Sequence, residues 1–303
     1  MVDLSVDIGG LIIKNPVMTA SGTCGNGEEL VDFMNIQDLG ALVVKGTTLE
    51  PRQGNDYPRM AETASGMLNT IGLQNKGAHY FHDELYPRIA HLNDNIIVNV
   101  SGSKIEDYVT VCELLQDLPN CTAVEVNISC PNIKEGGLAF GTSCPAAAQV
   151  TKEVRKVWKG HMMVKLSPNV TSIAEIAKAV QDEGADSVSL VNTFLAMAID
   201  AKTRRPVLST ITGGLSGPAI KPIALRMVWQ VYQAVKIPVI GMGGIMNATD
   251  AIEFMLAGAT AIQVGTATFI DPATCTKVIK GIEEYCEEQG VKSVKELIGG
   301  MIV

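Results

Sequence analysis

The residues with the greatest chemical potential follow a short apolar run, in the segment Asn127-Ile-Ser-Cys130-Pro131-Asn132. Cys130 opens a glycine-containing stretch that reaches Gly141, where a thiol could meet a substrate. A free thiol has a pKa of about 8.5, so it can abstract a proton where water is excluded and a cation is near. We therefore identify Cys130 as a candidate base. The alternative is a buried cysteine at the end of a strand.

Two lysines close apolar runs in the same way. Lys45 ends the run ALVVK, and Lys165 closes the run MMVKL. An unpaired buried ammonium group is strongly disfavoured, so neither lysine is expected to fill space in a core. Two cations at one site fit a ligand that carries or develops negative charge. The alternative is that both lysines extend to solvent or form ion pairs at the rim of the fold.

Three asparagines close further runs, at Asn99, Asn127 and Asn192. An asparagine side chain offers a hydrogen-bond donor and an acceptor, so a ring of them suits a flat heterocycle with amide-like edges. The alternative is turn chemistry, because asparagine is common where strands end. Three asparagines at one rim favour a ligand.

Glycines close the last two runs, in Gly241-Met-Gly243-Gly244 and in Gly265-Thr266. Glycines let backbone N–H groups approach a phosphate, and a helix expected to begin after Asn247 adds a favourable dipole. Phosphate sites recur after strands 7 and 8 of parallel barrels. Met246 stands where the third glycine of a G-x-G-x-x-G motif would be, so a Rossmann site is excluded. The alternative is a pair of tight turns.

The positions of the histidines and cysteines exclude several other kinds of catalytic or metal site. The four histidines fall outside the ends of the runs, so neither a histidine-based triad nor a zinc site is expected. The seven cysteines have no spacing that could hold a metal or an iron–sulfur cluster, and we expect most of them to be buried and inert. Glu125 lies inside the fourth run, where pairing with a neighbouring lysine is the only explanation that we find.

The elements that position these residues are eight short runs rich in valine and isoleucine. Runs that do not alternate are typical of strands buried on both faces of a parallel sheet. A parallel barrel places its active site at the C-terminal ends of its strands, where these polar side chains fall. The runs are PVMTA before Ser21, ALVVK, IIVNV, AVEVN, MMVKL, SVSLVN, PVIGMGG and AIQVGT. The fold class is therefore α/β, a (β/α)8 TIM barrel.

Helix signals alternate with the runs, which favours one domain over residues 1–303. Ser103-Lys-Ile-Glu106 and Ser172-Ile-Ala-Glu175 have the spacing of capping boxes. Residues 4–14, with Gly9-Gly10 inside, predict a hairpin that closes the bottom of the barrel. Three long connections follow strands and are expected to lie over the active face, from Thr47 to Asn75, Ser129 to Cys144 and Thr193 to Pro218.

Composition narrows the classes of partner. The net charge is −8 without a lysine- or arginine-rich block, so neither nucleic acid nor an anionic membrane is an expected partner. The first residues lack a secretory signal, and no apolar stretch approaches the roughly 20 residues that span a bilayer. We expect a cytoplasmic protein.

Together these motifs resemble the dihydroorotate dehydrogenases, flavoprotein barrels of pyrimidine synthesis. The resemblance covers essentially the whole chain. The cysteine at position 130 is similar to that of the class 1 enzymes. The sequences of two loops are similar to those of the NAD-linked class 1B catalytic subunit. The motifs are VVKGTT, NTIGLQN, NISCPN, TGGLSGPAIKP, GMGGI and QVGTA, with KEGGLAFGT and RRPVL for class 1B.

The resemblance implies an FMN site and a substrate site that share residues. The isoalloxazine would be held by Ser21, Lys45, Gly46, Asn99, Asn127, Lys165 and Val191, and the ribityl phosphate by Gly217, Gly243, Gly244, Gly265 and Thr266. The substrate, dihydroorotate, would be held by Lys45, Asn69, Thr70, Ile71, Gly72, Leu73, Asn127, Asn192 and Thr193. No metal site is implied.

The implied reaction oxidises (S)-dihydroorotate to orotate. Cys130 would remove the C5 proton while a hydride leaves C6 for the flavin, and Lys165 would stabilise negative charge there. Electrons would pass to NAD+ through a partner subunit that carries FAD and a [2Fe–2S] cluster, in a heterotetramer of two of each chain with a homodimer of this chain at its centre.

Several alternatives stay open at this point. On the same fold they are a dihydrouracil-type dehydrogenase and a fumarate-linked class 1A enzyme. From other classes they are a phosphate-binding barrel lyase or isomerase without flavin, and a flavin-binding regulator that is not an enzyme.

Overall fold

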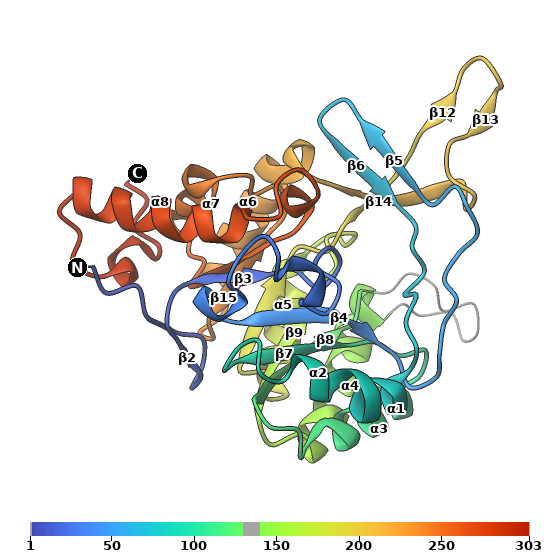
Figure 1. Ribbon diagram of the computed structural model, residues 1–303, viewed down its shortest axis with the longest axis horizontal. Helices are drawn as coiled ribbons and strands as arrows, with labels where there is room; N and C mark the ends of the chain where they lie inside the picture. Colours follow the sequence, from blue (N-terminus) through green and yellow to red (C-terminus); the bar gives the residue numbers. More distant parts are fainter. Residues whose placement is uncertain (1, 130–139, 303) are drawn as a thin grey trace.

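Eight parallel strands form one sheet that curls into a barrel in the computed structural model, which describes residues 2–129 and 140–302 (Figure 1). Neighbours pair in the order β3-β16-β15-β10-β9-β8-β7-β4, and a parallel bridge between Met18 and Ala41 joins the two edges. The strands are β3 Val17–Thr19, β4 Leu42–Thr47, β7 Ile96–Val100, β8 Cys121–Asn127, β9 His161–Lys165, β10 Ser187–Leu190, β15 Val239–Met242 and β16 Ala261–Val264. Each overlaps one predicted run, so the predicted TIM barrel is confirmed.

Helices cover the outside of this barrel in the connections between strands (Figure 1). They bury apolar residues at helical spacing, as Ile173, Ile176 and Val180 do in α5. The helices are α1 Ala78–Tyr80, α2 Tyr86–Ile89, α3 Ile105–Leu115, α4 Cys144–Val157, α5 Ile173–Asp182, α6 Lys221–Tyr232, α7 Ala248–Leu256 and α8 Thr274–Glu288. Within residues 2–129 and 140–302, no helix is both long and apolar enough to cross a bilayer.

Short helical turns complete the connections. A π-helical turn, η3, joins α1 to α2. Between β3 and β4 the described chain has two short 3-10 helices and no α-helix, so the predicted alternation of strand and helix is wrong for this first connection. The turns are η1 Glu28–Leu30, η2 Ile36–Asp38, η3 Phe81–Leu85, η4 Phe140–Thr142, η5 Pro218–Ile220, η6 Thr266–Phe269 and η7 Val294–Leu297.

Both predicted capping boxes differ in the structure. Ser172 precedes α5 as expected, but its side chain makes no capping hydrogen bond. At α3 the carboxylate of Asp107, one residue beyond the predicted Glu106, accepts from the N–H groups of Ser103 (2.8 Å) and Lys104 (3.2 Å). Both helices form nonetheless, because their buried faces stabilise them more than any single cap does.

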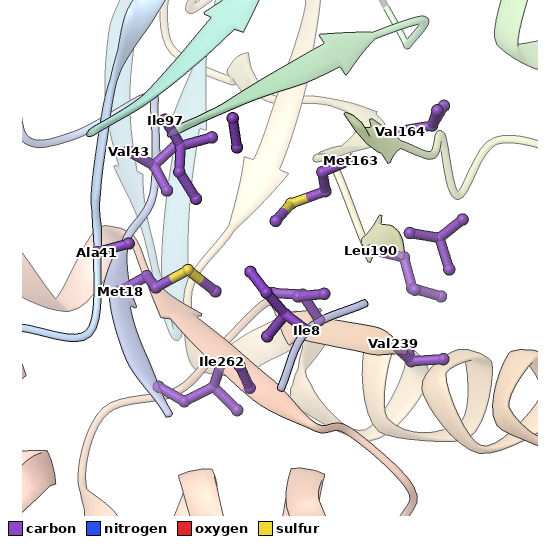
Figure 2. Packing of buried hydrophobic residues seen from close by; sticks show 14 of the residues in the cluster. Ile8, Met18, Ala41, Val43, Ile97, Met163, Val164, Leu190, Val239 and Ile262 are labelled. Carbon is purple, nitrogen blue, oxygen red and sulfur yellow. The ribbon is translucent and has the colours of Figure 1, made fainter. Parts of the chain in front are cut away.

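The N-terminal hairpin closes the bottom of the barrel, as predicted. Strands β1 (Val6–Asp7) and β2 (Ile12–Ile13) pair antiparallel, and Gly9 and Gly10 take the positive φ angles of 109° and 88° that the turn requires. Figure 2 shows Ile8, which is fully buried, among barrel side chains including Met18, Met163 and Ile262. The hairpin therefore supplies a plug to the apolar core.

Two of the long connections pair with each other instead of forming separate loops. Strands β5 (Met60–Thr63), β6 (Gly66–Asn69), β11 (Phe194–Met197) and β14 (Thr212–Ser216) form an antiparallel sheet in the order β11-β14-β6-β5. Beyond it, β12 (Ile199–Asp200) and β13 (Arg205–Pro206) form a two-stranded extension that projects from the barrel (Figure 1). Each long connection leaves the C-terminal end of a strand, so the predicted placement over the active face is confirmed for these two.

Glycine makes this close pairing possible. A Cβ atom added at Gly214 in β14 would lie 2.0 Å from Thr193 Oγ1, so a side chain there would separate the strands. The third long connection, from Ser129 to Cys144, contains residues 130–139, which lie outside the described residues together with the candidate base Cys130.

Candidate active site

Lys165 and Ser21 meet at the C-terminal ends of β9 and β3. Lys165 is 5% exposed, and its Nζ atom lies 3.4 Å from Ser21 Oγ. The same Nζ atom lies 3.7 Å from the carboxylate of Glu125, which is fully buried in β8. The expected lysine partner of Glu125 is therefore Lys165. Lys165 does form an ion pair, as the alternative to a ligand site predicted. The pair lies inside the barrel, however, and not at an exposed rim.

Lys45, in contrast, has an ammonium group without an acceptor in the described part of the chain. Burial lowers the pKa of Lys45, and the positive charges of Arg59 and Lys165 lower it further. Lys45 also borders a cavity of about 220 Å3 that Thr47 and Asn75 help to line. Glu28 and Glu29 also line this cavity and the three predicted asparagines do not, so the cavity itself is not the predicted anion site. A half-buried cation without an acceptor fits the predicted site for an anionic ligand.

The three predicted asparagines form one hydrogen-bonded chain. Asn99 Nδ2 donates to Glu125 Oε2 (2.6 Å), and Asn127 Nδ2 donates to Asn99 Oδ1 (3.3 Å). Ser129 Oγ donates to Asn127 Oδ1 (2.6 Å) and accepts from Asn192 Nδ2. The parallel register explains the contacts, because it sets Asn99 level with Glu125 and Asn127 level with Lys165. We name Glu125, Asn99, Asn127, Ser129 and Asn192 the asparagine chain.

The predicted phosphate glycines also come together. Gly244 has a φ angle of 87°, and a Cβ atom there would lie 2.8 Å from the carbonyl oxygen of Gly217. Within the described residues, the N–H groups of Gly244 and Thr266 donate no hydrogen bond to the chain. Val191 lies beside this loop, with Cγ2 3.1 Å from a Cβ atom added at Gly243. Unused N–H groups in a narrow glycine loop suit a phosphate.

The start of α7 supports this loop. Asn247 Oδ1 accepts from the N–H group of Asp250 (3.1 Å), so the predicted cap is confirmed. Asp250 in turn accepts from the N–H group of Met246 (2.8 Å) and from Lys221 Nζ (2.6 Å). The loop before α7 is thereby fixed from two sides.

The predicted substrate segment Asn69–Leu73 lies against the same face. Gly72 and Leu73 have φ angles of 77° and 56°, and Asn75 Nδ2 donates to the carbonyl oxygen of Leu73 (2.7 Å). A Cβ atom added at Gly46 would lie 3.5 Å from Leu73 Cδ2 and 2.9 Å from Asn99 Oδ1. This segment therefore reaches the asparagine chain through the bare backbone of Gly46.

Hydrogen bonds with Asn55, Gly214 and Asn192 hold the remaining predicted substrate residues. Thr70 Oγ1 accepts from Asn55 Nδ2 (2.9 Å), and the carbonyl oxygen of Ile71 accepts from the N–H group of Asn55 (3.0 Å). Asn69 Nδ2 donates to the carbonyl oxygen of Gly214 (3.4 Å). Thr193 donates its N–H group to Asn192 Oδ1 (2.8 Å), at the end of the asparagine chain.

These positions fit the FMN that the family resemblance implies. Gly46 has no side chain next to Asn99, and Lys165 lies beside Ser21 at the same end of the barrel, so these polar groups suit a flat ring with amide-like edges. The free N–H groups of Gly244 and Thr266 suit its phosphate, and Gly265 lies next to Thr266, with Ala20 Cβ 3.5 Å from a Cβ atom added at Gly265. The strand-end residues and the glycine loop thus offer complementary parts of one FMN site. Cys130 lies outside the described residues.

Buried cysteines among the described residues do not offer another nucleophile. Burial raises the pKa of Cys24 to about 11 and that of Cys275 to about 12. Thiols of this kind remain protonated near neutral pH and are unreactive. In residues 2–129 and 140–302, no three histidine, cysteine, aspartate or glutamate side chains gather to hold a metal ion.

Sequence reasoning missed three residues of the site. Ser129 links two asparagines, Asn75 holds the substrate segment, and Gln263 Nε2 donates to Glu125 Oε1 (2.8 Å). A polar residue inside an apolar run was the available signal for Gln263. Ser129 and Asn75 stand inside the motifs NISCPN and NTIGLQN, but only their three-dimensional contacts give them a role.

Comparison with known proteins agrees with this arrangement. A family model described as "Dihydroorotate dehydrogenase" matches residues 3–286. The chain is 63% identical to a protein of Parabacteroides distasonis over 99% of both chains, and 63% identical to one of Bacteroides thetaiotaomicron over the full length of both. A Porphyromonas gingivalis protein is 60% identical over 100% of this chain and 99% of its own. All three are named dihydroorotate dehydrogenase B (NAD(+)), catalytic subunit.

Proposed function

The chain belongs to the dihydroorotate dehydrogenase family, and we propose that it oxidises (S)-dihydroorotate to orotate, a step of pyrimidine biosynthesis. The observation that carries the proposal is the half-buried ammonium of Lys45, which has no acceptor among the described residues, at the same barrel mouth as the asparagine chain. Dihydroorotate is a flat ring with amide edges and one carboxylate. Lys45 can pair with the carboxylate, and the asparagine chain can supply donors and acceptors to the amide edges.

We propose that FMN binds between the strand ends and the glycine loop. When bound, FMN supplies the acceptor for a hydride. The groups assigned to its ring are Ser21, Lys45, Gly46, Asn99, Asn127, Lys165 and Val191, and those assigned to its phosphate end are Gly217, Gly243, Gly244, Gly265 and Thr266.

The chain's own residues then bind and deprotonate the substrate. Lys45 pairs with the carboxylate, and Asn127 and Asn192 orient the ring, with the segment Asn69–Leu73 and Thr193 completing the pocket. The thiolate of Cys130 would accept the proton from C5, and the hydride from C6 would pass to bound FMN, so two electrons would leave the substrate. Lys165 holds a positive charge where negative charge develops.

We propose that these electrons reach NAD+ through a second subunit that carries FAD and a [2Fe–2S] cluster. The relatives are named as catalytic subunits of NAD+-linked enzymes, which supports a partner chain. The cysteine spacing of this chain suits no iron–sulfur cluster, which agrees with a cluster on that partner. The assembly proposed is a heterotetramer of two of each chain around a homodimer of this one.

A visible absorption spectrum of the purified chain tests this function. We expect a flavin spectrum that bleaches when dihydroorotate is added without oxygen, and no bleaching with dihydrouracil, which offers no carboxylate to Lys45. A colourless chain would favour a flavin-free lyase or isomerase, and a yellow chain that dihydroorotate does not bleach would favour a regulator. Bleaching by dihydrouracil would favour the dihydropyrimidine alternative.

The electron acceptor is tested separately. Co-purification from the native source should yield a partner with FAD and an iron–sulfur cluster, and the complex should reduce NAD+. Rapid reoxidation of the isolated chain by fumarate would instead favour a class 1A enzyme.

Orotate affinity should fall at alkaline pH because of Lys45. Burial lowers the pKa of Lys45 from 10.5, so its charge is present below the lowered value and is lost as the pH rises through it. The dissociation constant of orotate, measured from pH 7 upward, should therefore increase earlier than for an exposed lysine. Lys45→Arg is the control, because a guanidinium stays charged over this range. If both proteins lose orotate at the same pH, the titration belongs to another group.

Gly244→Ala should prevent FMN binding. The new Cβ atom would lie 2.8 Å from the carbonyl oxygen of Gly217, so the loop must open and its N–H groups must move. Gly10→Ala is a matched control, because Gly10 has a φ angle of 88° but no heavy atom within 4 Å of the added Cβ. Both variants pay a backbone cost of about 1–2 kcal/mol. Equilibrium dialysis with FMN should separate them, and equal binding would place the phosphate elsewhere.

A further inference from the structure

Glu125 is a charged residue at the centre of the barrel that reaches four other strands. It is fully buried in β8. Its Oε1 atom accepts from Ser189 Oγ and from Gln263 Nε2, both at 2.8 Å. Its Oε2 atom accepts from Asn99 Nδ2 at 2.6 Å and lies 3.7 Å from Lys165 Nζ. A buried carboxylate destabilises the fold unless it is paired in this way, so the presence of Glu125 inside the barrel needs a physical explanation.

A carboxylate satisfies this set of neighbours in the orientations that they have. Both oxygens of Glu125 face donors, from Asn99 on one side and from Gln263 on the other. An amide has a single acceptor atom, so a glutamine in this place would turn its NH2 group toward one of those two donors. The charge also provides a counter-ion for Lys165, which is buried as well.

The carboxylate gives the asparagine chain a direction. Because Asn99 donates to Glu125, its carbonyl oxygen faces Asn127 and accepts from it. Asn127 must then turn its own carbonyl oxygen to Ser129, whose hydroxyl is left to accept from Asn192. At the far end, the N–H group of Thr193 donates to Asn192 Oδ1, which requires the same orientation. Every amide in the chain is thus oriented without a conflict between donors.

We propose that Glu125 is a positioning residue for ligand recognition: its carboxylate fixes which edge of Asn99 and Asn127 faces the ligand, and it holds Lys165 in place. This inference rests on the proposed function, because it takes those side chains as the ones that bind FMN and orotate. Glu125 itself need not touch either ligand. A fixed amide orientation matters because a reversed amide offers a donor where the ligand also has one.

The test compares Glu125→Gln with a control of similar burial. Asn93→Ala is that control, since Asn93 is fully buried and donates to the carbonyl oxygens of Ile36 (2.8 Å) and Leu39 (3.1 Å), which precede the N-terminal end of β4. Orotate binding to each FMN-loaded chain is measured by calorimetry, and FMN binding and melting temperature are measured beside it. Binding needs no turnover, so it reports recognition alone.

We expect Glu125→Gln to weaken orotate binding by about 10- to 100-fold, the range for loss of one charge-assisted hydrogen bond. Asn93→Ala should lower the melting temperature yet bind orotate as the wild type does. The positioning role is overturned if Glu125→Gln binds orotate as tightly as the wild type, or if the two variants lose affinity equally. If the wild type binds no orotate at all, the proposed function fails first, and the positioning role falls with it.

Ser129→Ala provides a second route if Glu125→Gln does not fold. It cuts the asparagine chain between Asn127 and Asn192 without leaving a buried charge unpaired. Weaker orotate binding with little change in melting temperature supports the directed chain. Unchanged binding contradicts it.

Discussion

Cys130→Ser should lose most dihydroorotate turnover near neutral pH, by about a hundred- to ten-thousand-fold, while the protein keeps the visible spectrum of FMN. The expected size is that of a general base whose proton transfer is lost. A hydroxyl is a far weaker base than a thiol at this pH. FMN binding is expected to persist, because the groups that we assign to it come from the strand ends and the glycine loop.

The measurement is steady-state turnover as a function of pH, with FMN content determined for each preparation. Cys112→Ser is the matched control, because Cys112 is fully buried in α3 and burial raises the pKa of its thiol. The control should retain turnover. If Cys130→Ser also retains turnover, the base is another group. In that case the turnover of Cys130→Ser should not show the partial recovery at high pH that a serine base would give.

The barrel could be predicted from the sequence because its signals are local. Each strand is a short run of apolar residues, and the polar residue that closes it occupies the C-terminal rim whatever the neighbouring strand is. Lys165 and the three asparagines were therefore placed at one site without knowledge of their contacts. Their hydrogen bonds needed the register of adjacent strands, such as Asn127 beside Lys165, which no single run contains.

The antiparallel sheet over the active face could not be predicted in the same way. Gly214 of β14 pairs with Asn69 of β6, although the two residues are 145 positions apart in the sequence. Both segments look like loops when each is considered alone. The pairing depends on glycines that admit a close neighbour, and that neighbour is known only from the fold.

Glu125 shows the same limit at a single residue. In the sequence it is a charge inside an apolar strand, and a neighbouring lysine was its one expected partner. The structure adds Asn99, Ser189 and Gln263, which come from three further strands. A charge that conflicts with its local pattern is thus explained by distant residues, as is expected at functional sites.

Lys165→Ala should slow the oxidation of dihydroorotate by orders of magnitude, about a hundred- to a thousand-fold, the cost of removing one preorganised electrostatic contact. The ammonium is fixed between Ser21 and Glu125 before the substrate arrives, so it can stabilise developing negative charge without rearrangement. The measurement is the rate at which the flavin absorbance bleaches in a single turnover. That rate separates the chemistry from later electron transfer.

The control for Lys165→Ala must account for Glu125, which the substitution leaves buried without its cation. Breaking a buried pair from one side costs up to about 3–5 kcal/mol, so a slow rate could reflect a damaged fold. The double variant Lys165→Ala/Glu125→Gln removes both charges and should recover part of the free energy of unfolding. We expect it to recover none of the bleaching rate, because the missing cation, and not the unpaired carboxylate, limits the reaction. Recovery of the rate together with the stability would show that Lys165 serves the fold and not the chemistry.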